Sequence, residues 1–322
     1  MPQQLGLDSR AIIGRFYQTL ETVLGKSWAT MISMFITSNM ETELYKWLGM
    51  SPAMDEWKGS RRPQGLRANE PYSIRNKIFD ASMEIDVDDL RRDKTGQIMV
   101  RVDEFAARAA QHWEKLLSTL ILAGETTLCY DGFYYFDADH AEGKSGTQIN
   151  LLTASQVADL NIATATAPTP YEMAKAILGV IQHFYTLVDD QGEPINGEAR
   201  SFLAMVPVPF WGPAVAAMTS PLLNTGAGSI DNPMLALANN QQIQINVIPN
   251  PRLSTWTTEF AVFRTDGRAK PFIMQEEYGV KMIALAEGSE EEKKNRRHLY
   301  SVEASRNVGC GYWQHAMKAT LS

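Results

Sequence analysis

The sequence predicts an α+β fold, and three observations support this class. Apolar residues recur at helical spacing between Val102 and Ile121, which predicts a long amphipathic helix. Apolar residues alternate with polar ones between Lys77 and Val87, which predicts a strand. From Glu259 onward the chain is rich in short strand-like runs. Long helices together with a strand-rich end indicate an α+β protein.

The bulk composition is that of a globular protein. The chain has 322 residues, enough for one large or two modest domains, with 44% hydrophobic and 21% charged residues. The first residues lack a basic segment followed by an apolar one, so no signal peptide is expected. The two cysteines, Cys129 and Cys310, suit a reducing cytoplasm, although such a pair could still form a disulfide.

The net charge of -7 argues against a protein that reads DNA. Proteins that grip the duplex supply basic residues to its phosphates. The densest basic cluster here lies at 293–297, and three glutamates, residues 290–292, stand directly before it. A wall that merely encloses DNA has no such requirement.

The first elements follow from spacing and caps. A helix is predicted from about Asp8 to Leu24, because its apolar residues form one stripe and Gly25 ends it. The apolar run from Thr30 to Thr37 predicts a strand.

Residues 43–87 predict a long protruding hairpin. Residues 43–70 are rich in Trp, Pro, Gly and Arg without helical periodicity, and the alternating strand at 77–87 follows. An isolated hairpin is marginal in water, so this one is expected to lie on a partner.

Two further helices are predicted. The long helix spans 102–123, with Asp103 near its start and Gly124 just past its end. The second opens at Thr169-Pro170-Tyr171-Glu172, which is a capping box with proline at the first helical position.

The segment between Arg200 and Arg252 contains Asp231 as its only charged residue. Its prolines break any membrane-spanning helix, and its Asn and Gln residues are too polar for lipid. Charged residues are depleted at the centres of interfaces. The segment is therefore interpreted as a subunit interface or, alternatively, as internal core.

Four strands are predicted near the end of the chain, at 259–263, 271–275, 280–285 and 298–304. Between the last two lies a polar hairpin tip, residues 287–297, which carries charges of both signs. The tip is a candidate for pairing with copies of itself, because symmetric contacts favour self-complementary surfaces, and a solvated turn is the alternative.

Candidates for catalysis are weak. The best cluster, Asp131, Asp137, Asp139 and His140, could bind a divalent metal or act as acid and base, but a turn followed by an aromatic strand and a polar loop explains it better. The run Asp86, Asp88, Asp89 before Arg91 and Arg92 is interpreted as a solvated or intersubunit face rather than a metal site. Cys310 is close to His315 in the sequence, but a thiol nucleophile would need further partners that cannot be assigned, so a buried or inert thiol is favoured. No catalytic, cofactor-binding or metal-binding residue is predicted.

Five segments resemble the major head subunits of Mu-like bacteriophages and occur in the family order. They cover about 45–140 and 255–317: Tyr45–Gly49 with Glu56–Gly59, Tyr72–Lys77 running on to Asp89, Cys129–His140, Ala269–Glu276, and Ala304–Gln314. Each motif alone is weak, whereas five in order are specific.

The resemblance implies the Hong Kong 97-type capsid fold. It assigns an N-terminal arm to 1–28, an extended loop to 43–87 and an axial domain to 151–268, which the C-terminal strand at 307–322 joins. The peripheral domain would comprise 29–42 and 88–150, with a spine helix at 102–123, and the strands at 269–306 with the peripheral loop at 287–297.

The implied function is that of a structural protein of the virion and not of an enzyme. The chain would assemble with itself into the hexamers and pentamers of an icosahedral head, with a scaffold protein, a portal and in some cases a decoration protein as partners. It would enclose double-stranded DNA without specific contacts, bind no cofactor or membrane, and assemble in the cytoplasm of the bacterial host. The alternatives are an encapsulin-like nanocompartment shell and a metal-dependent hydrolase.

Contacts between subunits are predicted in the extended loop and the peripheral loop. The residues are Trp57, Arg61, Arg62, Arg67, Glu290, Glu291, Glu292, Lys293, Lys294, Arg296 and Arg297.

Overall fold

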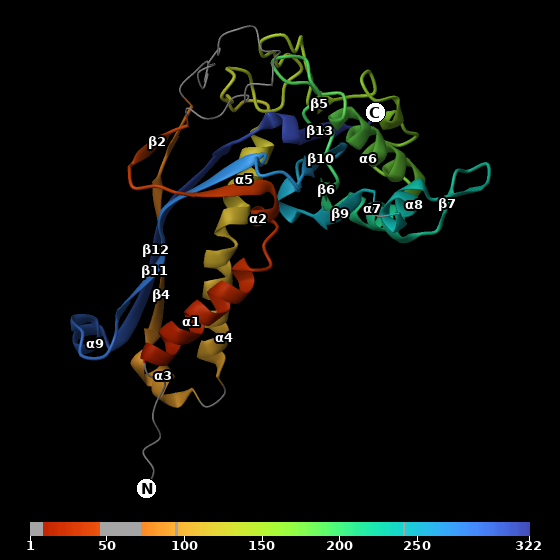
Figure 1. Cartoon of the computed structure of the whole chain (residues 1–322). Helices are drawn as coiled ribbons and strands as arrows, with labels where there is room; N and C mark the ends of the chain where they lie inside the picture. The colour runs from red at the N-terminus through yellow and green to blue at the C-terminus, as the bar shows by residue number, and fades with distance from the viewer. Residues whose placement is uncertain (1–8, 46–71, 94–95, 241) are drawn as a thin grey trace, which may run out of the picture.

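The computed structural model describes residues 9–45, 72–93, 96–240 and 242–322, and within them the chain forms two arms (Figure 1). One arm is built on a four-stranded sheet of order β1-β11-β12-β4, and the other on a five-stranded sheet of order β5-β13-β10-β6-β9. One cluster of buried apolar side chains lies within the first arm. The other fills the second arm and extends into the first, where it includes Ile32 of α2 and Ile273 of β11. The arms meet near helix α5, His112–Leu122.

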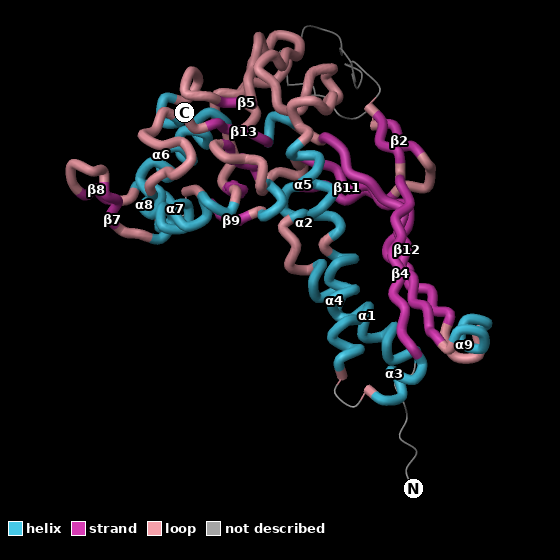
Figure 2. The backbone as a smooth tube through the Cα atoms, turned by 180° about the vertical axis from the view of Figure 1, so that it is seen from behind, coloured by secondary structure: helices cyan, strands magenta, loops and turns pink. Residues whose placement is uncertain are grey.

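The first arm combines long strands with a helical column. Its strands are β1 (Ser33–Thr37), β4 (Lys77–Asp86), β11 (Phe272–Leu285) and β12 (Arg297–Cys310). Its helices are α1 (Ser9–Leu24), α2 (Ala29–Ile32), α3 (Val87–Arg92), α4 (Gln97–Ala110) and α9 (Glu290–Asn295). Figure 2 shows α4 and α5 running end to end alongside these strands. Phe16 of α1, Ala106 of α4 and Tyr300 of β12 lie in the buried cluster that joins the layers.

The predicted long helix at 102–123 is present, but its start was placed wrongly. The helix begins at Gln97 because the Asp93 carboxylate accepts hydrogen bonds from the backbone N–H groups of Gln97 (3.2 Å) and Ile98 (2.9 Å). It is also two helices, α4 and α5, separated by Gln111. At this junction the buried Arg306 of β12 donates to the Ala109 carbonyl at 3.2 Å.

The sequence had indicated a hairpin between β4 and the residues after 43, but among the described residues the partner of β4 is β12. Strand β4 pairs antiparallel with β12 over its whole length, from Lys77 with Arg306 to Asp86 with Arg297. The described part of the predicted hairpin is its base, where β2 (Thr42–Leu44) pairs antiparallel with β3 (Ser73–Arg75).

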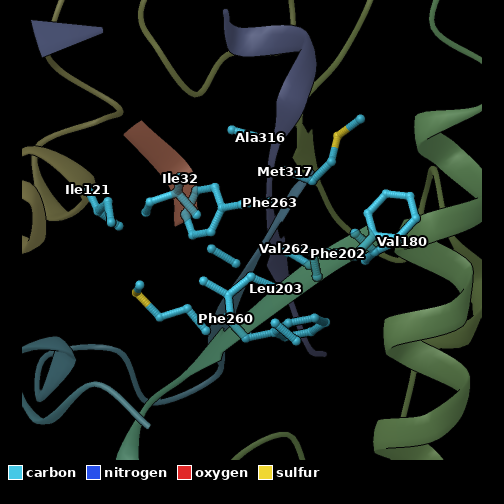
Figure 3. Close-up of a cluster of buried hydrophobic side chains, with 14 of the residues drawn as sticks. Ile32, Ile121, Val180, Phe202, Leu203, Phe260, Val262, Phe263, Ala316 and Met317 are labelled. Atoms are coloured by element: carbon cyan, nitrogen blue, oxygen red, sulfur yellow. The ribbon is translucent and has the colours of Figure 1, made fainter. Parts of the chain in front are cut away.

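The second arm surrounds the five-stranded sheet. Its strands are β5 (Leu151–Leu152), β6 (Ser201–Val206), β9 (Gln244–Pro249), β10 (Glu259–Arg264) and β13 (Ala316–Thr320). The remaining elements are η1 (Ala158–Leu160), α6 (Pro170–Phe184), α7 (Val208–Thr219), β7 (Leu222–Asn224), β8 (Ser229–Asp231), α8 (Pro233–Asn239), η2 (Pro251–Leu253) and η3 (Trp313–His315). Figure 3 shows Phe202 beside Val180 of α6, and Phe263 on the side of the core where Ile32 of α2 lies.

The predicted capping box is confirmed. The Thr169 hydroxyl accepts from the Glu172 N–H, and the Glu172 carboxylate accepts from the Thr169 N–H at 2.8 Å.

Three other predictions need correction. The apolar run at 30–37 begins with the helical turn α2, and only Ser33–Thr37 is a strand. The strands predicted at 271–275 and 280–285 are one strand, β11, with bulges between Glu276 and Lys281. The tip at 287–297 contains the short helix α9 instead of a plain turn. None of the helices in the described part of the chain is long and apolar enough to span a bilayer.

Candidate assembly surfaces

Helix α7 has two apolar faces. Phe210, Ala214 and Ala217 are buried in the core of the second arm. On the opposite side Val208 is 53% exposed, Trp211 is 48% exposed and neither has a charged neighbour along the helix. A helix that is apolar all round is normally buried on all sides, so this exposed face lacks a covering element among the described residues.

The hairpin β7–β8, which follows α7 in the sequence, also exposes apolar side chains. Leu222 is 56% exposed and Ile230 is 41% exposed. The hairpin is tied to α7 by Asn232, whose amide donates to the carbonyls of Ala217 (2.6 Å) and Ser220 (2.8 Å). We call Val208, Trp211, Val215, Leu222 and Ile230 the 208–230 surface. In the hairpin Leu222 pairs with Asp231 and Ile230 pairs with Leu223, so Leu222 and Ile230 project from opposite faces. Exposed apolar side chains such as these five are candidates for contact with another protein.

The charged residues predicted in the peripheral loop lie at the far end of the β11–β12 pair (Figure 1). Ser289 caps α9 by accepting from the Glu292 N–H, and Glu290 pairs with Lys294 inside the helix. Glu291 accepts from the Asn295 amide at 2.7 Å. Glu290, Glu291, Glu292, Lys293, Lys294, Arg296 and Arg297 are thus brought together on α9 and the start of β12.

Besides Lys294, two of these cations pair with carboxylates outside the loop. Arg296 pairs with Asp88 at 2.7 Å, and Arg297 pairs with Glu84 at 2.6 Å. Asp86 accepts from the Asp88 N–H and so caps α3, which supports the interpretation of the 86–92 run as a structural face. Pairing of the loop with its copies stays a prediction. Fewer of its charged side chains are available for such contacts than the sequence indicated, because several form ion pairs within the subunit.

The contacts predicted in the extended loop, Trp57, Arg61, Arg62 and Arg67, lie outside the described residues. The described part of the molecule offers an acidic counterpart on the exposed face of the four-stranded sheet. Asp80 of β4 and Glu303 of β12 are register partners, so their side chains share this face.

The Asp131–His140 pair is buried structure. His140 Nδ1 lies 2.6 Å from Asp131 Oδ2, and both side chains are fully buried. The His140 ring stacks on Trp313 with centroids 3.9 Å apart. Asp137 accepts from the backbone N–H groups of Tyr134 and Ala138. Among the described residues no three His, Cys, Asp or Glu side chains are grouped to hold a metal.

The remaining candidates for chemistry are also buried. Cys129 and Cys310 are free thiols inside the protein. Burial raises the pKa of the Cys129 thiol well above its ordinary value, which disfavours a reactive thiolate. Burial lowers the pKa of His315 to about 4.

Deprotonation of Glu142, which lies near the Asp131–His140 pair, is expected to make the protein less stable as the pH rises. Burial, reinforced by the Asp131 carboxylate, raises its pKa from 4.5 to about 7. The folded state therefore holds a proton that the unfolded chain releases. The stabilisation is complete below about pH 4.5 and is lost as the pH rises through about 7. This contribution to the free energy of unfolding is at most about 3 kcal/mol, and screening by solvent reduces it.

The check is thermal unfolding of the wild type and of Glu142→Gln at pH 5 and pH 8. The variant should lose less stability than the wild type between these values. The comparison uses the loss of stability in the wild type minus the loss in the variant. Other groups such as His315 change stability with pH in the opposite direction, but they do so equally in both proteins and cancel. Equal losses in the two proteins would contradict the assignment.

Sequence reasoning marked the 200–252 segment but not its contact residues. Val208, Trp211 and Val215 recur at helical spacing, as do Phe210, Ala214 and Ala217. Two apolar stripes on one helix are the signal that could have singled out Trp211.

A family model described as the Mu-like prophage major head subunit gpT matches residues 10–168 and 229–322. The chain is 32% identical over 130 residues to the Mu-like prophage FluMu major head subunit of Haemophilus influenzae, covering 40% of this chain and 42% of that protein. It is 36% identical over 109 residues to the major capsid protein of Escherichia phage Mu, covering 34% of this chain and 35% of that protein. The chain thus spans less than half the length of both relatives in these matches.

Solved structures share the fold. The procapsid of bacteriophage JBD30 is similar with a TM-score of 0.54 and 20% identity, covering 98% of this chain and 75% of that one. The mature capsid of bacteriophage PhiM1 gives 0.53 at 10% identity, covering 92% and 87%. A virus-like particle from Pyrococcus furiosus gives 0.52 at 7% identity, covering 95% and 96%. The predicted α+β fold of the Hong Kong 97 type is confirmed.

Proposed function

This chain belongs to the Mu-like prophage major head subunit gpT family, and on that premise we propose that it is the major capsid protein of a tailed double-stranded DNA bacteriophage. Copies assemble into the hexamers and pentamers of an icosahedral head. The observation that carries this beyond family membership is the 208–230 surface, whose five apolar side chains are exposed in the single subunit. Such a surface needs a partner, and a neighbouring copy supplies one.

The low charge of this segment fits a place where copies crowd together. Residues 201–230 carry no charged side chain. Around a rotational axis every charge meets its own copies, so like charges would repel, whereas apolar groups pack in any number. Many modest contacts then hold each subunit at once, which makes a durable shell.

The partners beyond the shell itself are a scaffold protein, a portal and in some heads a decoration protein. The mature protein resides in the virion, and assembly takes place in the cytoplasm of the bacterial host. DNA is enclosed without specific contacts, which agrees with the net charge of -7. The role is structural, and the buried Asp131–His140 pair serves packing rather than catalysis.

A second candidate is the shell of a cellular nanocompartment. This candidate is retained because the chain has the same fold as the virus-like particle from Pyrococcus furiosus, with a TM-score of 0.52. The two functions differ in what the particle contains. Nuclease-protected double-stranded DNA in particles from the native source supports the phage head, whereas a protein cargo supports the compartment.

The function is tested by electron microscopy of the protein expressed alone and together with its scaffold protein. Closed icosahedral particles, or rings of six and five subunits, are expected. A dispersed monomer under both conditions would overturn the proposal.

Charge reversal in the extended loop, Arg61→Glu with Arg62→Glu, is expected to block assembly and leave the subunit folded. We propose that these cations bind the carboxylates of Asp80 and Glu303 on a neighbouring copy. The two carboxylates are adjacent on one sheet face, where Lys281 is the other register partner of Glu303 and Asp80 lies on the edge strand β4 without a cation opposite it in β12. The yield of closed particles should fall at least tenfold by electron microscopy, while circular dichroism stays unchanged.

The compensating variant restores the attraction with the signs exchanged. Adding Asp80→Lys and Glu303→Lys to the loop variant should return a measurable part of the particle yield. Wild-type yields from the loop variant alone would refute the loop contact. Failure of the compensating pair to recover any particles would refute its assignment to Asp80 and Glu303.

A further inference from the structure

A buried polar cluster lies at the base of the extended loop and is centred on Gln275 of β11. The Gln275 side chain is fully buried. Its amide oxygen accepts from the Tyr45 hydroxyl at 2.5 Å. Its amide nitrogen donates to the Asn76 side-chain oxygen at 2.8 Å and to the Ile74 carbonyl at 3.1 Å. One side chain of the sheet thus contacts both sides of the loop base.

Asn76 extends the cluster to the segment between β1 and β2, which leads into the loop. Its amide donates to the Ser38 hydroxyl at 3.1 Å and to the Met40 carbonyl at 2.8 Å. Ser38 in turn donates to Glu43 at 2.9 Å. Burial raises the pKa of Tyr45 to about 12, so its hydroxyl remains a donor at any physiological pH.

Strand β12 holds the other end of the base. The Cys310 N–H donates to the Tyr72 hydroxyl at 2.6 Å, and the Asn307 amide donates to the Arg75 carbonyl at 2.7 Å. Gly309 leaves room for Ile74, since a Cβ at 309 would lie 2.3 Å from the Ile74 Cδ1 atom. Tyr45 and Tyr72, the two ends between which residues 46–71 run, are therefore both fixed to the four-stranded sheet.

The pairing within the base is too small to orient it. Strands β2 and β3 pair through three residues each, and a two-stranded ribbon of this kind is marginal by itself. Apolar contacts tolerate sliding, whereas a satisfied buried hydrogen-bond network specifies one arrangement. The direction of the base relative to the sheet is thus set by the cluster around Gln275 on one side, together with the two bonds from β12 on the other.

We propose that Gln275 is a positioning residue for shell assembly. It holds the loop base in the one direction that lets the extended loop meet a neighbouring subunit, and so it sets how subunits are placed in the shell. The inference rests on the proposed function as a capsid protein. It predicts that loosening the cluster changes assembly far more than it changes the folding of the subunit.

The test compares Gln275→Met with Gln148→Met. Methionine keeps the length of the side chain and removes its hydrogen bonds. Gln148 is a matched control, because it is also buried and bonds through both amide atoms to the backbone of Val188, at 2.7 and 2.8 Å, away from the loop base. Both variants are expected to fold with a similar loss of melting temperature.

Only Gln275→Met should reduce the yield of particles of wild-type diameter, by at least tenfold, in electron microscopy. Hydrogen exchange of the backbone N–H groups of Tyr45 and Asn76, which bond to Tyr72 and Glu41, should become at least tenfold faster in that variant alone. The double variant Gln275→Met with Tyr45→Phe also removes the hydroxyl that donates to Gln275 in the wild type. It should regain melting temperature without regaining uniform particles, which a merely stabilising role of Gln275 does not predict.

The outcomes separate this inference from the proposed function. Unchanged exchange at Tyr45 and Asn76 in Gln275→Met overturns the positioning role even if the wild type forms shells. Faster exchange with normal particles also overturns it. A wild type that forms no particles refutes the proposed function instead, and with it the assembly role of Gln275, while the exchange result still decides whether Gln275 fixes the loop base.

Discussion

A glutamate in place of Trp211 is expected to abolish shell formation while leaving the subunit folded. Trp211 is 48% exposed on the outer face of α7, so the monomer can solvate the new carboxylate there. In the shell the same carboxylate would be buried against an uncharged neighbour. Removing a charge from water without a partner costs several kcal/mol, and each copy in the shell repeats that cost.

Assembly is measured by sedimentation velocity and electron microscopy, and folding by circular dichroism. Trp211→Phe is the conservative control and should assemble, because it keeps an aromatic side chain on the 208–230 surface. Tyr134→Glu places the same charge on an aromatic residue that is 45% exposed outside this surface, and it should assemble better than Trp211→Glu. Particles from Trp211→Glu at the wild-type yield would exclude α7 from the shell contacts.

Replacing Gly311 with alanine is expected to destabilise the subunit by about 3 kcal/mol or more. A Cβ at this position would lie 2.4 Å from the Lys270 carbonyl oxygen and 3.0 Å from backbone atoms of Pro271. These are main-chain atoms, so no side-chain rotation relieves the clash. The Gly311 N–H also donates to the Pro271 carbonyl at 2.8 Å, which holds the two segments together.

Gly14→Ala is the matched control for this substitution. Gly14 lies within α1, and a Cβ there meets nothing within 4 Å. Alanine should stabilise the helix by about 0.5 to 1 kcal/mol. Urea unfolding of the two variants and the wild type gives both differences. A Gly311→Ala protein within about 0.5 kcal/mol of the wild type would show that the backbone around Lys270 can move aside.

Local signals located the three helices that were predicted, whereas α7 and α8 were not predicted. The stripe and Gly25 placed α1 within one residue of its observed bounds, and the capping box placed the start of α6. The start of α4 was missed by five residues, although the signal was present. Asp93 caps the helix from four positions before Gln97, with Gly96 in a left-handed conformation between them.

Alternation identified β4 as a strand but assigned it to the wrong neighbour. Period-two spacing depends on which face of the strand is buried and says nothing about its pairing partner. Strand β12, more than 200 positions along the chain, competed for β4 and paired with all of it. A hairpin with the nearby residues was favoured from sequence because short connections are the common ones.

The order of residues was sufficient to predict the α+β class, the capping box of α6, the stripe of α1, the family and the charge-poor segment that contains the 208–230 surface. These features depend on hydrogen bonds and side-chain spacing within a turn or a strand, which the order of residues specifies directly. Only the tertiary structure decided which face of α7 is left exposed, that Asp131 and His140 form a buried pair, and that Gln275 binds Tyr45. The last contact joins residues 230 positions apart, and no local pattern encodes such a contact because it exists only after two distant strands have packed together.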